Sequence, residues 1–339
     1  MIRQSIIMLL LAIPFMALSQ EDLTMRIAYD FDQMTEIDQN LITNASEECL
    51  KKLVDKDIEG FWASCHPEFK EATPLVSFKE IGKILSNMLP TMDSIIFIDA
   101  KKVDFTTTPT TSMFSTGGSL DQSDPTYLQF YTLEGMDKQA ISIYKTISDQ
   151  IARAITLKFG LLKGKYLLTS FEINACALNG KDATYYLDLA NKWASKDTDI
   201  SRFIALNMAY KLSYLCRGTS TKQLIDIITT VQKLQSDSTL ISEFREWTVQ
   251  DSVYDVINID FIETESDITP NIMYLSKREL GEINTEEESK LLFRYFMNKY
   301  PDLANEFKVF LFQAYEDYPA LQTKQYTYYR VIMDVDEMD

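Results

Sequence analysis

The chain has 339 residues, of which 46% are hydrophobic, and its formal net charge at pH 7 is −17. This hydrophobic content is ordinary for a protein with a packed core and excludes a globally disordered chain. The negative charge makes nucleic acid and anionic membranes poor partners, because an acidic surface repels phosphate groups.

The N-terminus has the features of a cleavable secretory signal peptide over residues 1–19. Arg3 supplies a positive start, the apolar run Ile6–Leu18 follows, and Ala17-Leu18-Ser19 places small residues where signal peptidase cuts. The run is too short to cross about 30 Å of hydrocarbon as a helix, and Pro14 interrupts it. We therefore expect cleavage near Ser19–Gln20 and a secreted or periplasmic product without a transmembrane segment in the mature chain.

Apolar residues at helical spacing predict three helices after the signal peptide. The predicted helices are Asp38–Lys52, Ile58–Cys65 and Phe78–Met88. The second is expected to end at His66-Pro67, because a residue that precedes proline disfavours the helical conformation. Ile95–Phe105 is then predicted to form a strand.

A polar segment, Thr106–Pro125, contains glycine and proline and is expected to be a loop without a packing face. Four strands are predicted after it, at Thr126–Leu133, Gln139–Ile147, Ile151–Phe159 and Lys165–Asn174. Short intervals between them indicate a hairpin meander. Their alternating apolar residues require that one face of the sheet be covered, and the three preceding helices can cover it.

The segment from Asp182 to about Val249 is predicted to be wholly helical. Within it, Ile200–Cys216 is apolar on nearly all sides, which is typical of a buried helix. No repeated period or repeat signature is present, so a small helical bundle is expected.

The C-terminal part is predicted to be a small α+β module of ββαββ order. A capping box at Thr285–Glu288 is expected to open a helix that runs to Tyr300. The strands predicted around this helix are Val253–Ile262, Asn271–Leu275, Val309–Tyr315 and Gln325–Val335.

Three segments of the N-terminal half resemble the nuclear transport factor 2-like family, which includes ketosteroid isomerases and polyketide cyclases. They are the helix–break–helix Leu50–Trp62, the turn His66-Pro67-Glu68-Phe69 and the closing strand Gly164–Ile173. The resemblance implies a cone-shaped domain of helices on a curved antiparallel sheet over residues 31–178. This fold carries both enzymes and non-catalytic binding proteins, so it does not determine the function.

The predicted fold class is therefore α+β, with four segments along the chain. Residues 1–19 form the signal peptide, 31–178 the cone-shaped domain, 179–250 the helical bundle and 251–339 the C-terminal module. The junction near Asn179–Asp182 contains a glycine and small polar residues, and we expect residues 20–180 to fold alone.

His66 is the only histidine in the chain, which excludes zinc peptidases with two histidine ligands. Cys65 and His66 suggest a nucleophile and its base, but adjacent helical residues point about 100° apart. We expect instead that His66 stabilises the C-terminal end of a helix.

The resemblance implies that catalytic groups would project from the sheet and the helices into the cone. The candidates are His66, Arg153 and Glu172 for catalysis, and Trp62, Tyr131 and Tyr144 for ligand binding, with Asp57 beside Trp62. Glu172 shares its face with Ser170 and is expected to meet solvent, and Arg153 is expected at an exposed strand end.

The sequence contains no metal-binding motif and no phosphate, flavin or nicotinamide fingerprint, so no metal or cofactor is expected. The four cysteines are Cys49, Cys65, Cys176 and Cys216. Cys49 and Cys65 could face each other, although buried thiols are the preferred interpretation.

We expect a non-catalytic module that binds a small ligand or a protein. An isomerase- or hydrolase-like enzyme that uses the cone, and a structural envelope component, remain alternatives. A cone filled by its own side chains would favour the binding module.

Overall fold

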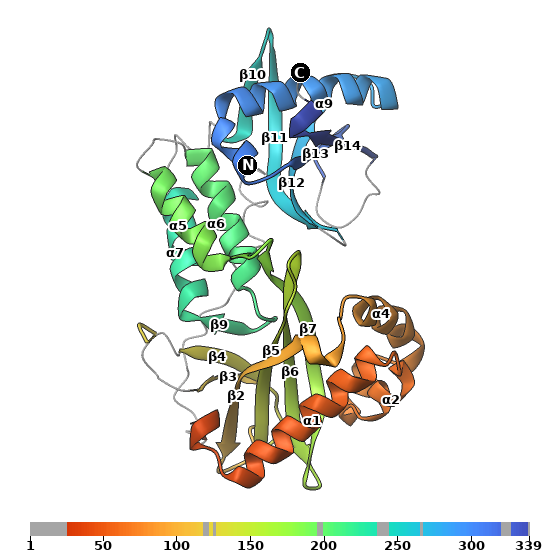
Figure 1. Cartoon of the computed structure of the whole chain (residues 1–339), viewed down its shortest axis with the longest axis vertical. Helices are drawn as coiled ribbons and strands as arrows, with labels where there is room; N and C mark the ends of the chain where they lie inside the picture. The colour runs from red at the N-terminus through yellow and green to blue at the C-terminus, as the bar shows by residue number, and fades with distance from the viewer. Residues whose placement is uncertain are drawn as a thin grey trace. The chain divides into compact units, whose positions relative to one another are not determined.

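The computed structural model describes residues 26–117, 122–124, 127–194, 199–235, 244–264, 267–319 and 327–337 (Figure 1). The expected signal peptide and part of the predicted loop Thr106–Pro125 lie outside the described residues. The chain divides into two compact units. The N-terminal unit holds the described residues up to 235 and those of 260–270, and the C-terminal unit holds 244–259 and 271–337. Both contain helices and sheet, so the predicted α+β class is confirmed.

The N-terminal unit is built on a strongly curled, antiparallel, six-stranded half-barrel, called sheet A here (Figure 1). Its strand order is β1-β2-β5-β6-β7-β8. The strands are β1 (Arg26–Asp30), β2 (Ile95–Phe105), β5 (Lys138–Thr146), β6 (Ile151–Leu162), β7 (Lys165–Leu178) and β8 (Lys181–Asp182). The strands predicted at β2, β5, β6 and β7 are confirmed, and β1 was not predicted.

Four helices pack on the inner face of sheet A. They are α1 (Glu36–Val54), α2 (Ile58–Ala63), α3 (Pro67–Ala72) and α4 (Leu75–Asn87). Three of them were predicted, whereas α3 begins at the proline that was expected only to end α2. Proline suits the first position of a helix, because its fixed φ is helical and its missing N–H would have no partner there.

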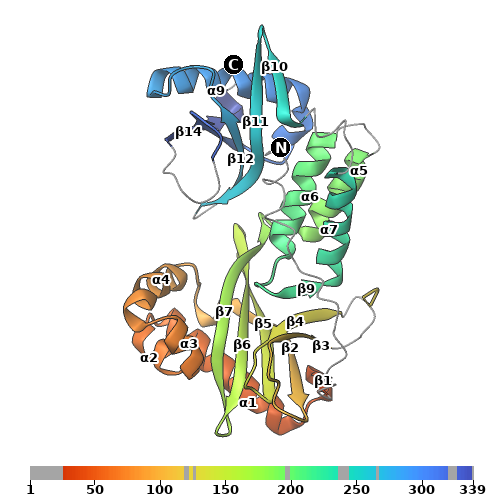
Figure 2. The ribbon, with the colours of Figure 1, turned by 180° about the vertical axis from the view of Figure 1, so that it is seen from behind.

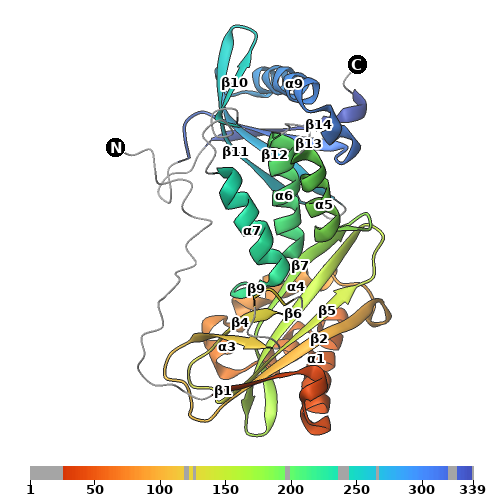
Figure 3. The same ribbon diagram turned by 90° about the vertical axis from the view of Figure 1, so that its left-hand side faces the viewer.

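A second sheet, called sheet B here, packs on the outer face of sheet A, which lies away from α1 (Figure 3). It joins β3 (Met113–Gly117), β4 (Leu128–Thr132) and β9 (Thr219–Thr221) in the order β3-β4-β9 (Figure 2). Phe130 of β4 packs against Val103 and Ile141 of sheet A. The prediction that β4 belongs to the meander is therefore wrong, as is the prediction that the whole segment before it is a loop. Alternation shows that a strand has a buried face but not which sheet it joins.

Three helices follow sheet A in the chain. They are α5 (Ala183–Ala194), α6 (Asp199–Ser213) and α7 (Lys222–Gln235), and α6 packs against both of the others. Ile200, Ile204 and Met208 of α6 are fully buried, which confirms the prediction of a buried helix. The wholly helical interpretation of 182–249 is wrong at β9 and at β10 (Glu246–Val249).

The C-terminal unit contains a mixed five-stranded sheet of order β10-β11-β12-β13-β14 with one long helix, α9 (Glu282–Lys299). The strands are β10 (Glu246–Val249), β11 (Ser252–Glu263), β12 (Ile268–Leu275), β13 (Val309–Tyr315) and β14 (Tyr328–Asp334). The predicted ββαββ order is therefore present, with β10 added before it. The chain passes through α9 between β12 and β13, which are parallel.

The predicted capping box at Thr285 is wrong. The helix begins one turn earlier, and Gly281 is its N-cap. Thr285 is buried inside the helix. Acidic residues are favourable at any position in the first turns of a helix, so the run of glutamates does not show at which residue α9 begins.

Candidate functional site

The space between sheet A and its helices is filled by the protein's own side chains. The fully buried apolar residues from the helices include Ile42, Leu50, Leu53, Phe61 and Phe78, and those from the sheet include Ile155, Leu157, Phe159 and Leu168. Aromatic rings close the region beside α2, where the centroids of Phe61 and Phe78 are 5.5 Å apart and Phe171 lies 5.0 Å from Phe61. A dense interior of this kind leaves little room for a substrate.

Tyr144, a predicted ligand-binding residue, belongs to this filled interior. Its side chain is almost fully buried, and its hydroxyl lies beside Ser46. Nearby on the inner face, Ser46 Oγ and Ser142 Oγ lie 2.8 Å apart. Burial raises the pKa of Tyr144 to about 12, so its phenol keeps its proton at neutral pH.

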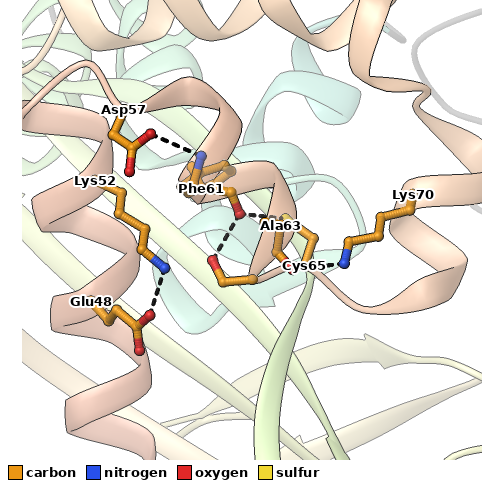
Figure 4. A network of polar contacts seen from close by, with 9 residues as sticks. Glu48, Lys52, Asp57, Phe61, Ala63, Cys65 and Lys70 are labelled. Carbon is orange, nitrogen blue, oxygen red and sulfur yellow. Dashed lines mark hydrogen bonds and ion pairs between the residues drawn. The ribbon is translucent and has the colours of Figure 1, made fainter.

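The turn between α2 and α3 is held by hydrogen bonds that account for several candidate residues (Figure 4). Asp57 caps α2, since its Oδ1 accepts from Gly60 N at 2.9 Å. Cys65 Sγ donates to Phe61 O at 3.4 Å, and Lys70 Nζ donates to Ala63 O at 2.7 Å. These side chains stabilise a turn and are already engaged.

His66 caps the N-terminus of α3, so its expected place at the C-terminal end of a helix is wrong. Its Nδ1 accepts from Glu68 N at 3.4 Å, and its backbone N donates to Leu168 O at 2.8 Å. Burial lowers the pKa of His66, which favours the neutral ring that can accept this bond. Burial also raises the pKa of Cys65 to about 12, so the neighbouring thiol is a poor nucleophile.

Trp62 and Tyr131 lie far apart in sequence and on different faces of the unit. Trp62 Nε1 donates to Thr73 O at 2.9 Å, so this ring ties α2 to the end of α3. Tyr131 lies on β4, is partly exposed and makes an edge contact with Phe114 on β3, with ring centroids 5.5 Å apart. Trp62 packs against the core cluster that contains Tyr144, whereas Tyr131 lies in sheet B, so the three predicted binding residues do not form one site.

A buried ionic cluster joins α1 to sheet A. Lys102 Nζ contacts Asp38 Oδ2 at 2.7 Å and Asp104 Oδ2 at 3.0 Å, and it lies 4.7 Å from the ring of Tyr29. Burial alone would lower the pKa of Lys102, but hydrogen bonds to the two carboxylates raise it. The ammonium is therefore charged at neutral pH and compensated, which suits a structural role.

The cluster that best fits a binding site lies where β6, β7, α6 and the end of β11 meet, and it includes the predicted residue Arg153. Arg153 is 6% exposed and forms an ion pair with Glu263, at the end of β11, instead of standing at an exposed strand end. A bulge between Ala152 and Arg153 interrupts the register of β6 and β7 at this point. Lys211 of α6 lies 3.8 Å from the other oxygen of Glu263. All of these residues belong to the N-terminal unit.

A cleft of about 260 Å³ opens beside this ion pair. Its lining residues are Asn174, Ala175, Tyr210, Lys211, Tyr214 and Glu263. Asn174 Nδ2 donates to Leu215 O at 2.9 Å, which fixes the amide and leaves its oxygen as an acceptor. Burial raises the pKa values of Tyr210 and Tyr214, so both hydroxyls keep their protons and can donate.

Glu172 lies next to this cleft and is half-buried. Its Oε1 accepts from the backbone N of Arg217 at 2.7 Å. Lys158 Nζ donates to Arg217 O at 2.9 Å on the same face. The charged groups at the cleft itself are Lys211 and the ion pair of Arg153 with Glu263. Lys158, Glu172 and Arg217 lie on the adjoining outer face of sheet A.

Sequence reasoning missed most of this cleft. Its residues come from β7, α6, the segment after α6 and β11, which are separated by up to about ninety positions. One signal was present, because Lys211 is one of few charged residues in the apolar segment Ile200–Cys216. A buried helix keeps a charged residue mainly where it has a partner.

Two further features of the described residues concern metal ions and membranes. None of the described groups of histidine, cysteine, aspartate and glutamate brings three such residues together to hold a metal ion. Among the described helices, none combines the length and apolar character needed to cross a membrane.

Comparisons with protein-family models, curated proteins and solved structures found no match to this chain. The structure thus defines the class of an α+β protein with a curled, helix-covered antiparallel sheet.

Proposed function

We propose that this is an exported, non-catalytic binding protein whose N-terminal unit has the nuclear transport factor 2-like fold. The observation that carries the proposal is the filled interior of that unit, where related enzymes would need an open pocket. Tyr144 and Phe61 occupy the space in which a substrate would have to bind. Catalysis also needs a group with access to a substrate, and the buried Lys102 cluster is internally compensated.

The outer cleft is the proposed ligand site, and a small organic anion is the ligand class that it fits. Lys211 keeps part of its side chain exposed, and its ammonium would attract a carboxylate. The hydroxyls of Tyr210 and Tyr214 add donors, and the oxygen of Asn174 adds an acceptor for a ligand hydroxyl or amine. A volume of about 260 Å³ lies just below the usual range for drug-sized ligands, so the ligand is about the size of one amino acid or sugar acid.

Thermal unfolding with a panel of amino acids, hydroxy acids, sugar acids and neutral sugars tests this proposal. A ligand that binds only the folded state raises its stability in proportion to the logarithm of ligand concentration. We expect at least one carboxylate to raise the melting temperature, and Lys211→Met to weaken its binding by about tenfold or more, which corresponds to about 1.4 kcal/mol. Lys165→Met, an exposed lysine of the same unit, is the matched control. Stabilisation by neutral sugars alone, or no loss in Lys211→Met, would contradict the proposed site.

Export is tested separately from ligand binding. The full-length chain, expressed in a secreting bacterium, is expected outside the cytoplasm with an N-terminus at or near Gln20. Recovery of intact Met1 in the membrane fraction would contradict the proposed export route.

A further inference from the structure

Half of strand β2 has an open edge. On one side, β5 is paired with β2 from Ile95 to Asp104. On the other side, β1 is paired only with residues Lys101–Phe105. Among the described residues, no strand is paired with the second edge of Ile95–Ala100, although the short helix Phe31–Gln33 lies beside it and the rings of Phe31 and Phe97 have centroids 4.9 Å apart. An open edge presents backbone N–H and C=O groups to which another extended chain can bind.

Three consecutive apolar side chains are exposed on this half of the strand. Ile96 is 42% exposed, Phe97 39% and Ile98 51%. Ile147, which follows β5 and donates its N–H to Ser94 O at 2.7 Å, is also exposed. Consecutive residues of a strand point to opposite faces, so this exposure follows the edge and does not belong to one uncovered face. Phe97 already contacts the rings of Phe31 and Tyr144, so an added strand would mainly cover Ile96 and Ile98.

A bulge limits the length of the open edge. The register of β2 and β5 shifts between Phe97 and Asp99, and Ala100 N is bonded to Asp99 Oδ1. Bulges and charged residues protect natural edges against extended, non-specific pairing. Here they leave a segment of about four residues, which suits a short specific strand better than unlimited stacking.

An acidic groove adjoins the start of this segment. It has a volume of about 560 Å³ and lies between α1 and Met92, which is three residues before β2 begins. Its polar lining consists of Asn44, Glu47, Glu48, Lys51 and Asp55. Glu48 is ion-paired with Lys52, so Glu47 and Asp55 face the single ammonium of Lys51 and leave a negative excess that attracts cations. A second copy of this chain, with its net charge of −17, would be repelled from it.

We propose that the open edge of β2 at Ile95–Ala100 binds an extended basic segment of another protein by strand addition. The partner's backbone would bond to the edge, its apolar side chains would cover Ile96 and Ile98, and its lysine or arginine side chains would reach the acidic groove. Strand addition takes its affinity from backbone bonds and its specificity from alternate side chains. This site goes beyond the proposed small-anion cleft and does not depend on it.

Fluorescence anisotropy with two labelled ten-residue peptides tests the proposal on the full chain. One peptide alternates valine with lysine, and the other alternates valine with glutamate. We expect the lysine peptide to bind at least tenfold more tightly than the glutamate peptide. Binding should protect the amides of Ile95–Ala100 from hydrogen exchange, and the preference should weaken as salt rises.

Four variants separate the edge from other surfaces. Ile98→Lys places a charge on the edge and is expected to weaken lysine-peptide binding by tenfold or more, whereas Val76→Lys, an 83% exposed position on α4, should not change it. The double variant Glu47→Lys/Glu48→Lys should abolish the preference for the lysine peptide. Lys211→Met should bind the peptide normally, which distinguishes this site from the anion cleft.

Three results would overturn the proposal. The first is equal affinity, or no affinity, for the two peptides. The second is normal peptide binding by Ile98→Lys. The third is a concentration-dependent dimer in sedimentation experiments that Ile98→Lys removes, because a second copy would then be the occupant of the edge.

Discussion

The ion pair of Arg153 and Glu263 predicts an asymmetry between two variants that remove the same contact. The Arg153 side chain is 7% exposed, whereas that of Glu263 is 22% exposed and also lies 3.8 Å from Lys211. Glu263→Gln would leave a buried guanidinium without its counter-charge, and breaking a buried pair in this way costs about 3–5 kcal/mol. The partial exposure of Glu263 reduces our expectation to about 2–4 kcal/mol. Arg153→Met would leave Glu263 partly hydrated and near Lys211, so we expect a loss of about 1 kcal/mol.

A double-mutant cycle measures this asymmetry. Urea unfolding of the full chain is followed by circular dichroism for the wild type, both single variants and the double variant. The double variant should be more stable than Glu263→Gln alone, because it removes the buried charge together with its partner. If Glu263→Gln costs no more than Arg153→Met, the guanidinium is not desolvated and the ion pair does not organise the cleft.

Four further predictions concern other parts of the chain. Burial lowers the pKa of His66 in the folded state. The neutral ring therefore contributes its full stabilisation above the unfolded-state pKa of 6.5, and this stabilisation is lost as the pH falls through the folded-state pKa. Asparagine can cap a helix but does not titrate, so His66→Asn is the reference. Between pH 7.5 and pH 5, the free energy of unfolding of the wild type, measured with urea, should fall by up to about 1 kcal/mol more than that of this variant. Glu288 is fully buried and accepts hydrogen bonds from Ser276 Oγ at 2.6 Å and from Lys277 N at 2.9 Å. Glu288→Ala should therefore lower the free energy of unfolding, measured with urea, by about 3 kcal/mol. A loss below about 1 kcal/mol would show that this network is dispensable. A thiol reagent at pH 8 should modify the half-buried Cys176 first, as read by mass spectrometry, and modification of the three buried cysteines before unfolding would contradict the structure. The fragment 20–180 should fold but have a lower melting temperature than the full chain, because it lacks β9 and the hydrogen bonds that Leu215 O accepts. Equal melting temperatures would show that these contacts do not stabilise the fold.

The sequence predicted those elements whose side-chain period is long and unbroken. β2 was predicted with its observed bounds, and α1 within two residues at each end, since alternation and helical spacing reveal a buried face directly. β4 was assigned to the wrong sheet, because a single strand's pattern carries no information about its partner. His66 was assigned to the wrong helix end, although a proline directly after it favours a helix start as well as a helix stop.

The candidate site was less predictable than the fold for a physical reason. Arg153 was identified as a candidate, but its partner Glu263 lies 110 positions further along the chain. Charge complementarity between such distant residues appears only once β6, α6 and the end of β11 are brought together. The sequence showed the local signals, namely an arginine in an apolar strand and a lysine in an apolar helix. It could not show that the two signals belong to one cleft.

The two proposed sites should act independently, and the order of the strands gives the reason. The open edge belongs to β2, while the cleft is built beside β6 and β7, with β5 between them. Adjacent strands lie about 4.8 Å apart, so β2 and β6 are separated by about 10 Å across the sheet. Side chains at that separation with no shared partner usually contribute additively. The double variant Ile98→Lys/Lys211→Met should therefore lose peptide binding and anion binding to the same extents as the two single variants. A larger loss in the double variant would mean that the curled sheet transmits a change from its edge to its outer face.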